Sequence, residues 1–187
     1  MSDELYIFDF DDTLVDSGAK VVVTRASGEE LSLSSAAYRD YDRLYKEEGD
    51  EVNFSEFDVY PPGASVIKST WNSFLTALSS VGQGNVMILT ARENPVPVKE
   101  FLSNAGVSPL PIIEAVGDSN PDAKKMVVAK YVRELGIKKV YLWEDSSANI
   151  SSIESLRSDE LEITSTLVSE GILRKLIQRI IRESQIF

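Results

Sequence analysis

Short apolar runs alternate with longer amphipathic segments along most of this chain. Runs such as Val86–Leu89 are continuously apolar rather than alternating. This pattern is typical of strands in a parallel sheet that helices cover on both faces. Five runs have the length of strands: Leu5–Phe10, Val86–Leu89, Ile112–Val116, Lys139–Trp143 and Leu161–Val168.

Between these runs, apolar residues recur three or four positions apart, which predicts helices. One helix is predicted from Ile67 to Leu78 and another from Val128 to Leu135, with shorter ones over Val98–Ala105 and Ile150–Leu156. The repeated alternation of strand and helix predicts a doubly wound, Rossmann-like α/β fold with a parallel sheet of about five strands. We expect one domain over residues 1–187.

Residues 16–62 depart from this alternation. The stretch KVVVTRASGEELSLS predicts a β-hairpin that turns at Ser27-Gly28. The following SSAAYRDYDRLYKEEG predicts a short helix that begins after a Ser cap and ends at Gly49. We therefore predict a small cap, inserted after the first strand, that overhangs the end of that strand. The alternative is a surface excursion with no role in substrate choice.

The final stretch, GILRKLIQRIIRESQIF, also has apolar residues at helical spacing. The main interpretation is a helix that closes the core. A dimer interface is the alternative, because Ile172 and Ile181 widen the apolar face. The sequence leaves the oligomeric state open.

Composition narrows the possible chemistry. The 187 residues include no His and no Cys, so no Ser-His-Asp triad, Cys nucleophile or His/Cys zinc site can be built. Carboxylates, hydroxyls, Lys, Arg and a hard metal ion remain. The formal net charge of -11 disfavours sequence-independent binding to nucleic acid or anionic membranes. Because no apolar run approaches the roughly 20 residues of a membrane span, and MSDELYIF lacks a secretory signal, we expect a soluble, cytoplasmic protein.

Polar residues collect at the carboxyl ends of the predicted strands, where open α/β sheets bind ligands. Each group alone has an ordinary explanation as a helix cap, a loop acid or a solvated Lys. Their joint occurrence at strand ends predicts one site. The groups are Asp9 to Thr13 after the first strand, Thr90-Ala91-Arg92 after the second, Glu144-Asp145 with Asn149 after the fourth, and Lys124-Lys125 at the start of the preceding helix.

These groups resemble the four motifs of the haloacid dehalogenase (HAD) superfamily. IFDFDDTL, with Asp9, Asp11 and Thr13, is similar to the first and most specific motif, and VMILT ends on Thr90 like the second. VYLWEDSSAN is similar to the fourth, although Glu144 stands where Asp or Gly is commoner. The resemblance spans roughly residues 5 to 155 and leaves out the cap and the tail.

The third motif is a Lys, which we place at Lys125, with Lys124 as the alternative. This choice puts a set of mostly apolar residues on one helix face behind the Lys. The set is Met126, Val128, Ala129 and Val132.

The resemblance implies a magnesium-dependent phosphatase that acts through an aspartyl-phosphate on Asp9. Asp11 would be the general acid and base, and its spacing puts it on the same side of an extended segment as Asp9. In the superfamily, Asp at this position is typical of phosphatases, whereas P-type ATPases have Thr and phosphonatases have Ala. We expect Asp12 to point away from the metal and to shape the loop.

The resemblance also implies ligands for the metal and the phosphate. Mg²⁺ would be held by Asp9, Asp145 and the backbone carbonyl of Asp11, while Glu144 and Asn149 orient these ligands from behind. The phosphoryl oxygens would be held by Thr90 and Lys125, with Ala91 and Arg92 beside them. The alternative for Arg92 is an ion pair with Glu93 or another surface acid.

The substrate is less well determined than the reaction. The small cap implies an open site, and we expect a nucleotide or another small phosphate ester. A polynucleotide 3′-phosphatase is an alternative by resemblance, against which the acidic balance argues. A non-catalytic binding module of the same fold is a second alternative. A response-regulator receiver is disfavoured, because its phosphorylated Asp follows a later strand.

Overall fold

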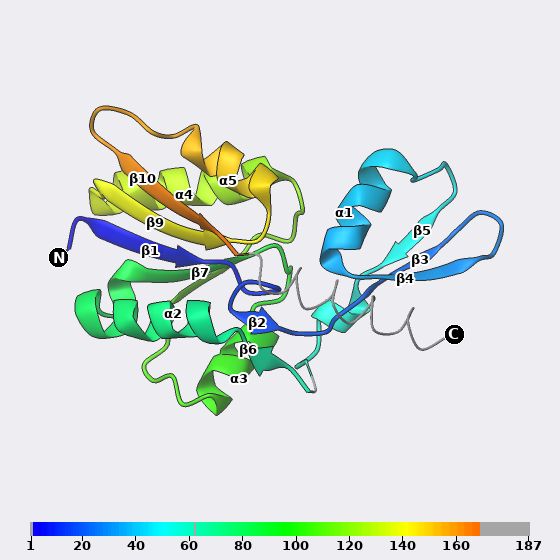
Figure 1. The fold of residues 1–187 in the computed structure, drawn as a ribbon, viewed down its shortest axis with the longest axis horizontal. Coiled ribbons are helices and arrows are strands. Elements are labelled where there is room, and N and C mark those ends of the chain that lie inside the picture. Colours follow the sequence, from blue (N-terminus) through cyan, green and yellow to red (C-terminus); the bar gives the residue numbers. More distant parts are fainter. Residues whose placement is uncertain (1, 62, 169–187) are drawn as a thin grey trace, which may run out of the picture.

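The computed structural model describes residues 2–61 and 63–168, and its body is a five-stranded sheet (Figure 1). The strand order is β10-β9-β1-β7-β8, and every neighbouring pair is parallel. The strands are β1 (Glu4–Phe8), β7 (Val86–Thr90), β8 (Ile112–Ala115), β9 (Lys139–Glu144) and β10 (Glu162–Leu167). The α/β fold class is confirmed. The helix predicted in the final stretch lies outside the described residues.

Helices cover both faces of the sheet, as the apolar strands require. Side chains alternate along β1, so that Phe8 packs with α2 and α3 while Ile7 packs with α4 and α5. Figure 1 shows these two helix pairs on opposite sides of the sheet. The helices are α2 (Lys68–Val81), α3 (Val96–Asn104), α4 (Pro121–Leu135) and α5 (Ser147–Glu154), and a short 3-10 turn, η2 (Gln83–Asn85), precedes β7.

The register of the central strand fixes where the polar strand ends meet. Phe8 of β1 lies opposite Ile88 of β7 and Trp143 of β9. The amide of Asp9 continues the pairing by donating to the carbonyl of Trp143 at 3.0 Å. The residues that follow β1, β7 and β9 therefore emerge side by side at one edge of the sheet.

The insert is a small sheet with one helix. Strands β3 (Val21–Thr24), β4 (Glu30–Leu33) and β5 (Glu51–Asn53) pair in the order β4-β3-β5, and α1 (Ser35–Leu44) packs on them. A separate apolar cluster fills the space between them: Val21, Val23, Tyr38 and Tyr41. The antiparallel pair β2 (Val15–Asp16) and β6 (Ser65–Val66) joins the insert to the body, and a 3-10 turn, η1 (Ser55–Phe57), follows β5.

The predicted hairpin and helix are present, with two differences. The helix α1 ends at Leu44 rather than at Gly49. In addition, β5 pairs with β3 as a third strand that the sequence pattern did not indicate. Three residues are too few to establish an alternating pattern.

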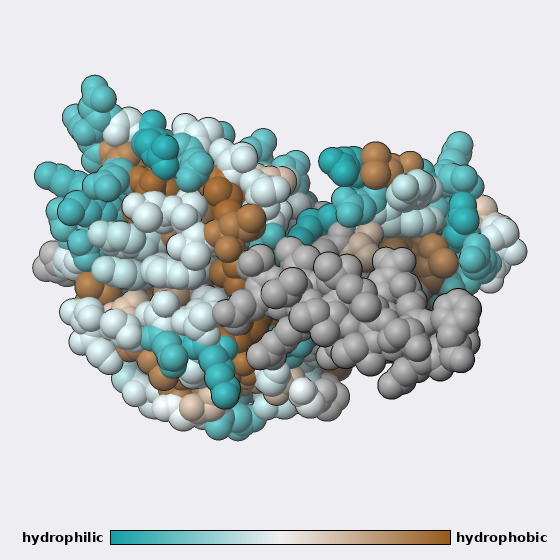
Figure 2. Space-filling view, viewed as in Figure 1, coloured by the Kyte–Doolittle hydropathy of each residue, from teal (hydrophilic) through white to brown (hydrophobic). Residues whose placement is uncertain are grey.

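The surface of the protein is mainly hydrophilic at its outer edges. Figure 2 shows hydrophilic residues along the outer edges of both the sheet body and the insert, in keeping with the net charge of -11. Within residues 2–61 and 63–168, no helix has both the length and the apolarity needed to cross a membrane.

Candidate functional site

The loop after β1 brings Asp9 and Asp11 to the sheet edge. The carbonyl of Phe10 accepts from the amides of Leu14 and Val15, both at 3.0 Å, which closes the loop tightly. Asp12 takes the left-handed conformation, with φ of 62°, which Asp tolerates better than most residues. Its backbone thus makes the turn, in agreement with the loop-shaping role expected for it.

The end of β9 brings two further carboxylates to the same place. Glu144 is buried, and its Oε1 accepts from the amide of Ser146 at 3.1 Å. Asp145 is also buried and follows directly. Ser146 caps α5, its Oγ accepting from the amide of Asn149 at 3.4 Å, while the Asn149 side chain hydrogen-bonds to Glu144. Asn149 therefore supports Glu144, whereas the prediction that both residues orient metal ligands stays a prediction.

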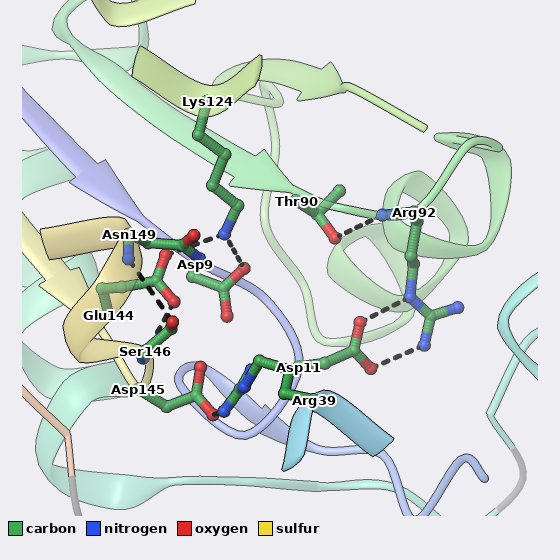
Figure 3. A network of polar contacts seen from close by, with 10 residues as sticks. All are labelled: Asp9, Asp11, Arg39, Thr90, Arg92, Lys124, Glu144, Asp145, Ser146 and Asn149. Carbon is green, nitrogen blue, oxygen red and sulfur yellow. Dashed lines mark hydrogen bonds and ion pairs between the residues drawn. The ribbon is translucent and has the colours of Figure 1, made fainter. Parts of the chain in front are cut away.

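The Lys in the site is Lys124, so the preference for Lys125 was wrong. Lys124 is buried, and its Nζ donates to Asp9 Oδ1 at 2.7 Å and to Glu144 Oε2 at 2.8 Å (Figure 3). Lys124 lies on the same face of α4 as Val128, which is fully buried. The choice of Lys125 assumed that Met126 was buried, whereas its exposed fraction is 71%. The helix is therefore rotated by one residue from the predicted phase.

Arg92 is committed to protein partners rather than to the site opening. Its Nε and Nη2 each donate to one oxygen of Asp11 at 2.7 Å, and its Nη1 donates to the carbonyl of Phe57 in the insert. Its guanidinium also lies over the rings of Phe10 and Phe57. Arg92 thus makes an ion pair with an acid, as its alternative interpretation expected, but the acid is Asp11 rather than Glu93 or another surface residue. A contact of Arg92 with phosphate stays a prediction.

Asp11 is held on a second side by Ser17. The Ser17 hydroxyl donates to Asp11 Oδ1 at 2.6 Å. The carboxylate of Asp11 thus receives three hydrogen bonds, which fix its orientation. This carboxylate faces Arg92 rather than the other three carboxylates, as Figure 3 shows.

Arg39 of α1 joins the site from the insert, which the sequence did not indicate. Its Nη2 donates to Asp145 Oδ2 at 2.9 Å across 106 positions of sequence. The side chain of Asp145 is 3% exposed and that of Arg39 is 37% exposed, so the pair lies at the mouth of the cluster. No local spacing distinguishes Arg39 from the other charged residues of its helix.

The other predicted phosphate ligands lie beside the cluster. Thr90 is buried, and its Oγ1 accepts from the amide of Arg92 at 3.2 Å. Ala91 is exposed at the start of the loop after β7. Thr90 thus lies at the carboxyl end of β7, which pairs with β1, and so at the predicted sheet edge.

Burial controls ionisation in this cluster. Burial raises the pKa of Asp9 well above its usual range, although Lys124 opposes the shift, and burial raises the pKa of Asp145 to about 6 against the effect of Arg39. Burial also opposes ionisation of Glu144, but Lys124 outweighs it and lowers the pKa of that carboxyl. Lys124 remains charged, because Asp9 and Glu144 overcome its desolvation and raise its pKa.

Three of the carboxylates are close enough to hold a metal ion. One oxygen from each of Asp9, Glu144 and Asp145 lies within 4.8 Å of the others. Such an all-oxygen set suits a hard cation. Glu144 already binds Lys124 and the amide of Ser146, so Asp9 and Asp145 are the better ligands. The carboxylate of Asp11 is not in this group, although the prediction for Asp11 concerned its backbone carbonyl.

Comparisons of this chain with protein-family models, with curated proteins and with solved structures gave no match. The fold and the contacts described above therefore carry the functional argument. They define an α/β protein with a Rossmann-like parallel sheet and a buried acidic cluster at its carboxyl edge.

Proposed function

We propose that this protein is a magnesium-dependent phosphatase of the HAD type that hydrolyses a phosphate monoester on Asp9. The observation that carries the proposal is the Asp9–Lys124–Glu144 contact beside Asp145 at the carboxyl edge of the sheet. It supports the proposal because a nucleophile, a fixed cation and a metal-ligand pair are the components that phosphoryl transfer needs.

The residues divide the chemistry as follows. An oxygen of Asp9 attacks phosphorus, the bond to the leaving oxygen breaks, and Asp11 gives that oxygen a proton. Water then attacks the aspartyl-phosphate and gives its proton to Asp11, which releases Asp9 and inorganic phosphate. Mg²⁺ bound by Asp9 and Asp145 would offset the repulsion between the carboxylates and the phosphate. Lys124 and Thr90 would bind the phosphoryl oxygens.

Arg92 has a positioning role in this scheme. Its two bonds to Asp11 and its bond to the carbonyl of Phe57 join the proton-transfer residue to the insert. Two of the three hydrogen bonds to Asp11 use Oδ1 and one uses Oδ2, so Oδ2 keeps a lone pair that can take up a proton. Arg92 would therefore hold the proton-transfer residue in a fixed orientation relative to the insert.

The substrate that fits this proposal is a nucleotide or another small phosphate ester. The insert contacts residues of the site through Arg39, which bonds Asp145, and through the carbonyl of Phe57, which accepts from Arg92. The net charge of -11 disfavours long polyanions.

The test compares Asp9→Asn with Asp12→Asn. Asp12 is a matched control because it lies in the same loop, where its backbone forms the turn. The wild type is expected to hydrolyse p-nitrophenyl phosphate with Mg²⁺ and to form an acid-stable phosphoprotein that mass spectrometry locates on Asp9. Asp9→Asn should abolish both signals, whereas Asp12→Asn should keep them. Unchanged hydrolysis by Asp9→Asn would show that the nucleophile is another residue, and an inactive wild type would favour a binding module.

A further inference from the structure

The insert supplies one cation to the acidic cluster, and that cation has hydrogen-bonding capacity left. Arg39 Nη2 holds Asp145 Oδ2 at 2.9 Å, and among the described residues no other hydrogen bond from its guanidinium is recorded. A guanidinium has five N–H donors in a planar fork. Its side chain is 37% exposed, so it is not enclosed by protein on all sides.

Arg92, the other Arg of the site, differs in each respect. Its side chain is 1% exposed, and its Nε, Nη1 and Nη2 all donate to protein acceptors. Arg92 therefore has little left to offer a ligand. Of Arg39 and Arg92, Arg39 has fewer protein contacts to give up when it changes partner.

The position of Arg39 suits a ligand bound at Asp9. Figure 3 shows its guanidinium beside Asp145, on the side of the cluster from which the insert approaches, with an oxygen of Asp9 pointing toward the same space. Asp145, Asp9 and Glu144 together raise the pKa of Arg39 against the effect of its burial, which places all three carboxylates within electrostatic range. A phosphoryl group attached to Asp9 would lie within that range.

The balance of charges in the cluster gives Arg39 a reason to exchange Asp145 for a phosphate. The cations are outnumbered by carboxylates: Arg39, Arg92 and Lys124 against Asp9, Asp11, Glu144 and Asp145. A divalent cation bound by Asp145 competes with Arg39 for that carboxylate, because both need its electron pairs and they repel one another. An incoming phosphate dianion offers Arg39 a stronger, bidentate partner.

We propose that Arg39 is a catalytic residue supplied by the insert, which leaves Asp145 when a divalent cation binds there and then binds the transferring phosphoryl group. This inference rests on the proposed phosphatase function. It gives the insert a part in the chemistry as well as in access to the site, because the charge that builds on the phosphoryl oxygens is met by a donor from α1.

The test compares Arg39→Gln with Arg43→Gln. Arg43 lies one turn further along α1 and pairs with Asp40 in solvent, which makes it a matched control. With Mg²⁺ present, Arg39→Gln should weaken inhibition by orthovanadate, which mimics the transferring phosphoryl group, at least about tenfold and lower kcat by about a hundredfold. Arg43→Gln should leave both unchanged. Arg39→Lys should recover part of each loss, because it restores the charge without the fork.

A second measurement separates contact with phosphate from support of Asp145. Mn²⁺ binding, followed by electron paramagnetic resonance without any phosphate ligand, should be as tight or tighter in Arg39→Gln, because a competing cation has been removed. Weaker Mn²⁺ binding would show that Arg39 only orients Asp145, and it would overturn the inference. Wild-type vanadate affinity in Arg39→Gln would overturn it as well.

The failure of this inference is distinguishable from failure of the proposed function. If the wild type hydrolyses phosphate esters and Arg39→Gln does so equally well, only the role of Arg39 is wrong. If the wild type neither hydrolyses them nor responds to vanadate, the phosphatase proposal falls, and the role of Arg39 falls with it.

Discussion

Lys124 is the residue on which the charge balance of the cluster depends. It lies between Asp9 and Glu144, and all three side chains are buried. A buried pair is costly to assemble, but removal of one partner costs far more, since the other charge is left without compensation. The lysine is thus needed for folding as well as for any chemistry at Asp9.

Replacement of Lys124 by Met should therefore destabilise the fold, while the same change at Lys125 should not. We expect Lys124→Met to lower the free energy of unfolding by about 3–5 kcal/mol, because Glu144 and Asp9 lose their cation. Lys125→Met should change it by less than about 0.5 kcal/mol. Urea unfolding followed by circular dichroism measures both, and equal losses would contradict the assignment of Lys124.

This pair of residues also shows where sequence reasoning stops at the residue scale. The strand ends that carry Asp9, Thr90 and Glu144 could be predicted, because buried parallel strands are continuous apolar runs in the sequence. The rotation of α4 could not, since an exposed Met126 looks like a core residue in the pattern. The role of Arg39 in the site could not be predicted, because its partner Asp145 is 106 positions away in the sequence.

At the scale of elements, the start of α4 places Lys124. Asn120 caps the helix, its side chain accepting from the amide of Asp122 at 3.0 Å, and Pro121 begins it with a suitable φ. Lys124 follows in the first turn. The direction in which its side chain enters the cluster therefore depends on where this helix begins.

Loss of this cap should cost stability and activity together. Asn120→Ala is expected to lower the free energy of unfolding by about 1 kcal/mol and to reduce kcat severalfold, because the first turn that holds Lys124 frays. Ser34→Ala removes the corresponding cap of α1, where Ser34 accepts from Ala37, and serves as the comparison for stability alone, because α1 carries Arg39. Denaturant titration and steady-state kinetics supply the two values. A stability loss without any change in kcat would mean that the cap does not position Lys124.

Elements of different length were not equally predictable. The five strands of the body agree with the predicted runs to within about two residues, which is the usual uncertainty of element ends. The two-residue strands β2 and β6 gave no signal, because pairing of such short segments is set by the surrounding fold. The insert is therefore the part whose shape the sequence described least well.

At the scale of the whole molecule, the acidic cluster ties stability to pH. The pKa of Asp145 is raised to about 6, mainly by burial, so the folded state favours its protonated form. The contribution of Asp145 to the free energy of unfolding is therefore fully present below the ordinary pKa of an Asp, and it is lost as the pH rises through about 6. Asp9 shifts in the same direction. A divalent cation bound by the ionised carboxylates would restore the stability lost at higher pH.

Added Mg²⁺ should therefore raise Tm more at about pH 7.5 than at about pH 5, where protons compete for the same oxygens. Thermal unfolding with Mg²⁺ or with EDTA at both pH values measures the difference. In Asp145→Asn the Mg²⁺ effect at the higher pH should be much smaller. An equal rise in Tm at both pH values would show that Mg²⁺ stabilises the protein at some other place.

The joint between insert and body has a consequence for how this protein can diversify. The chain leaves the body at β2 and returns at β6, where Val15 lies opposite Val66, and the insert between them has an apolar core of its own. Replacement of residues 17–64 by a different module would therefore leave the register of β1 unchanged. Exchange of the insert at that joint would thus keep the carboxylates that follow β1 and β9 and would remove Arg39, the cation that α1 contributes to them.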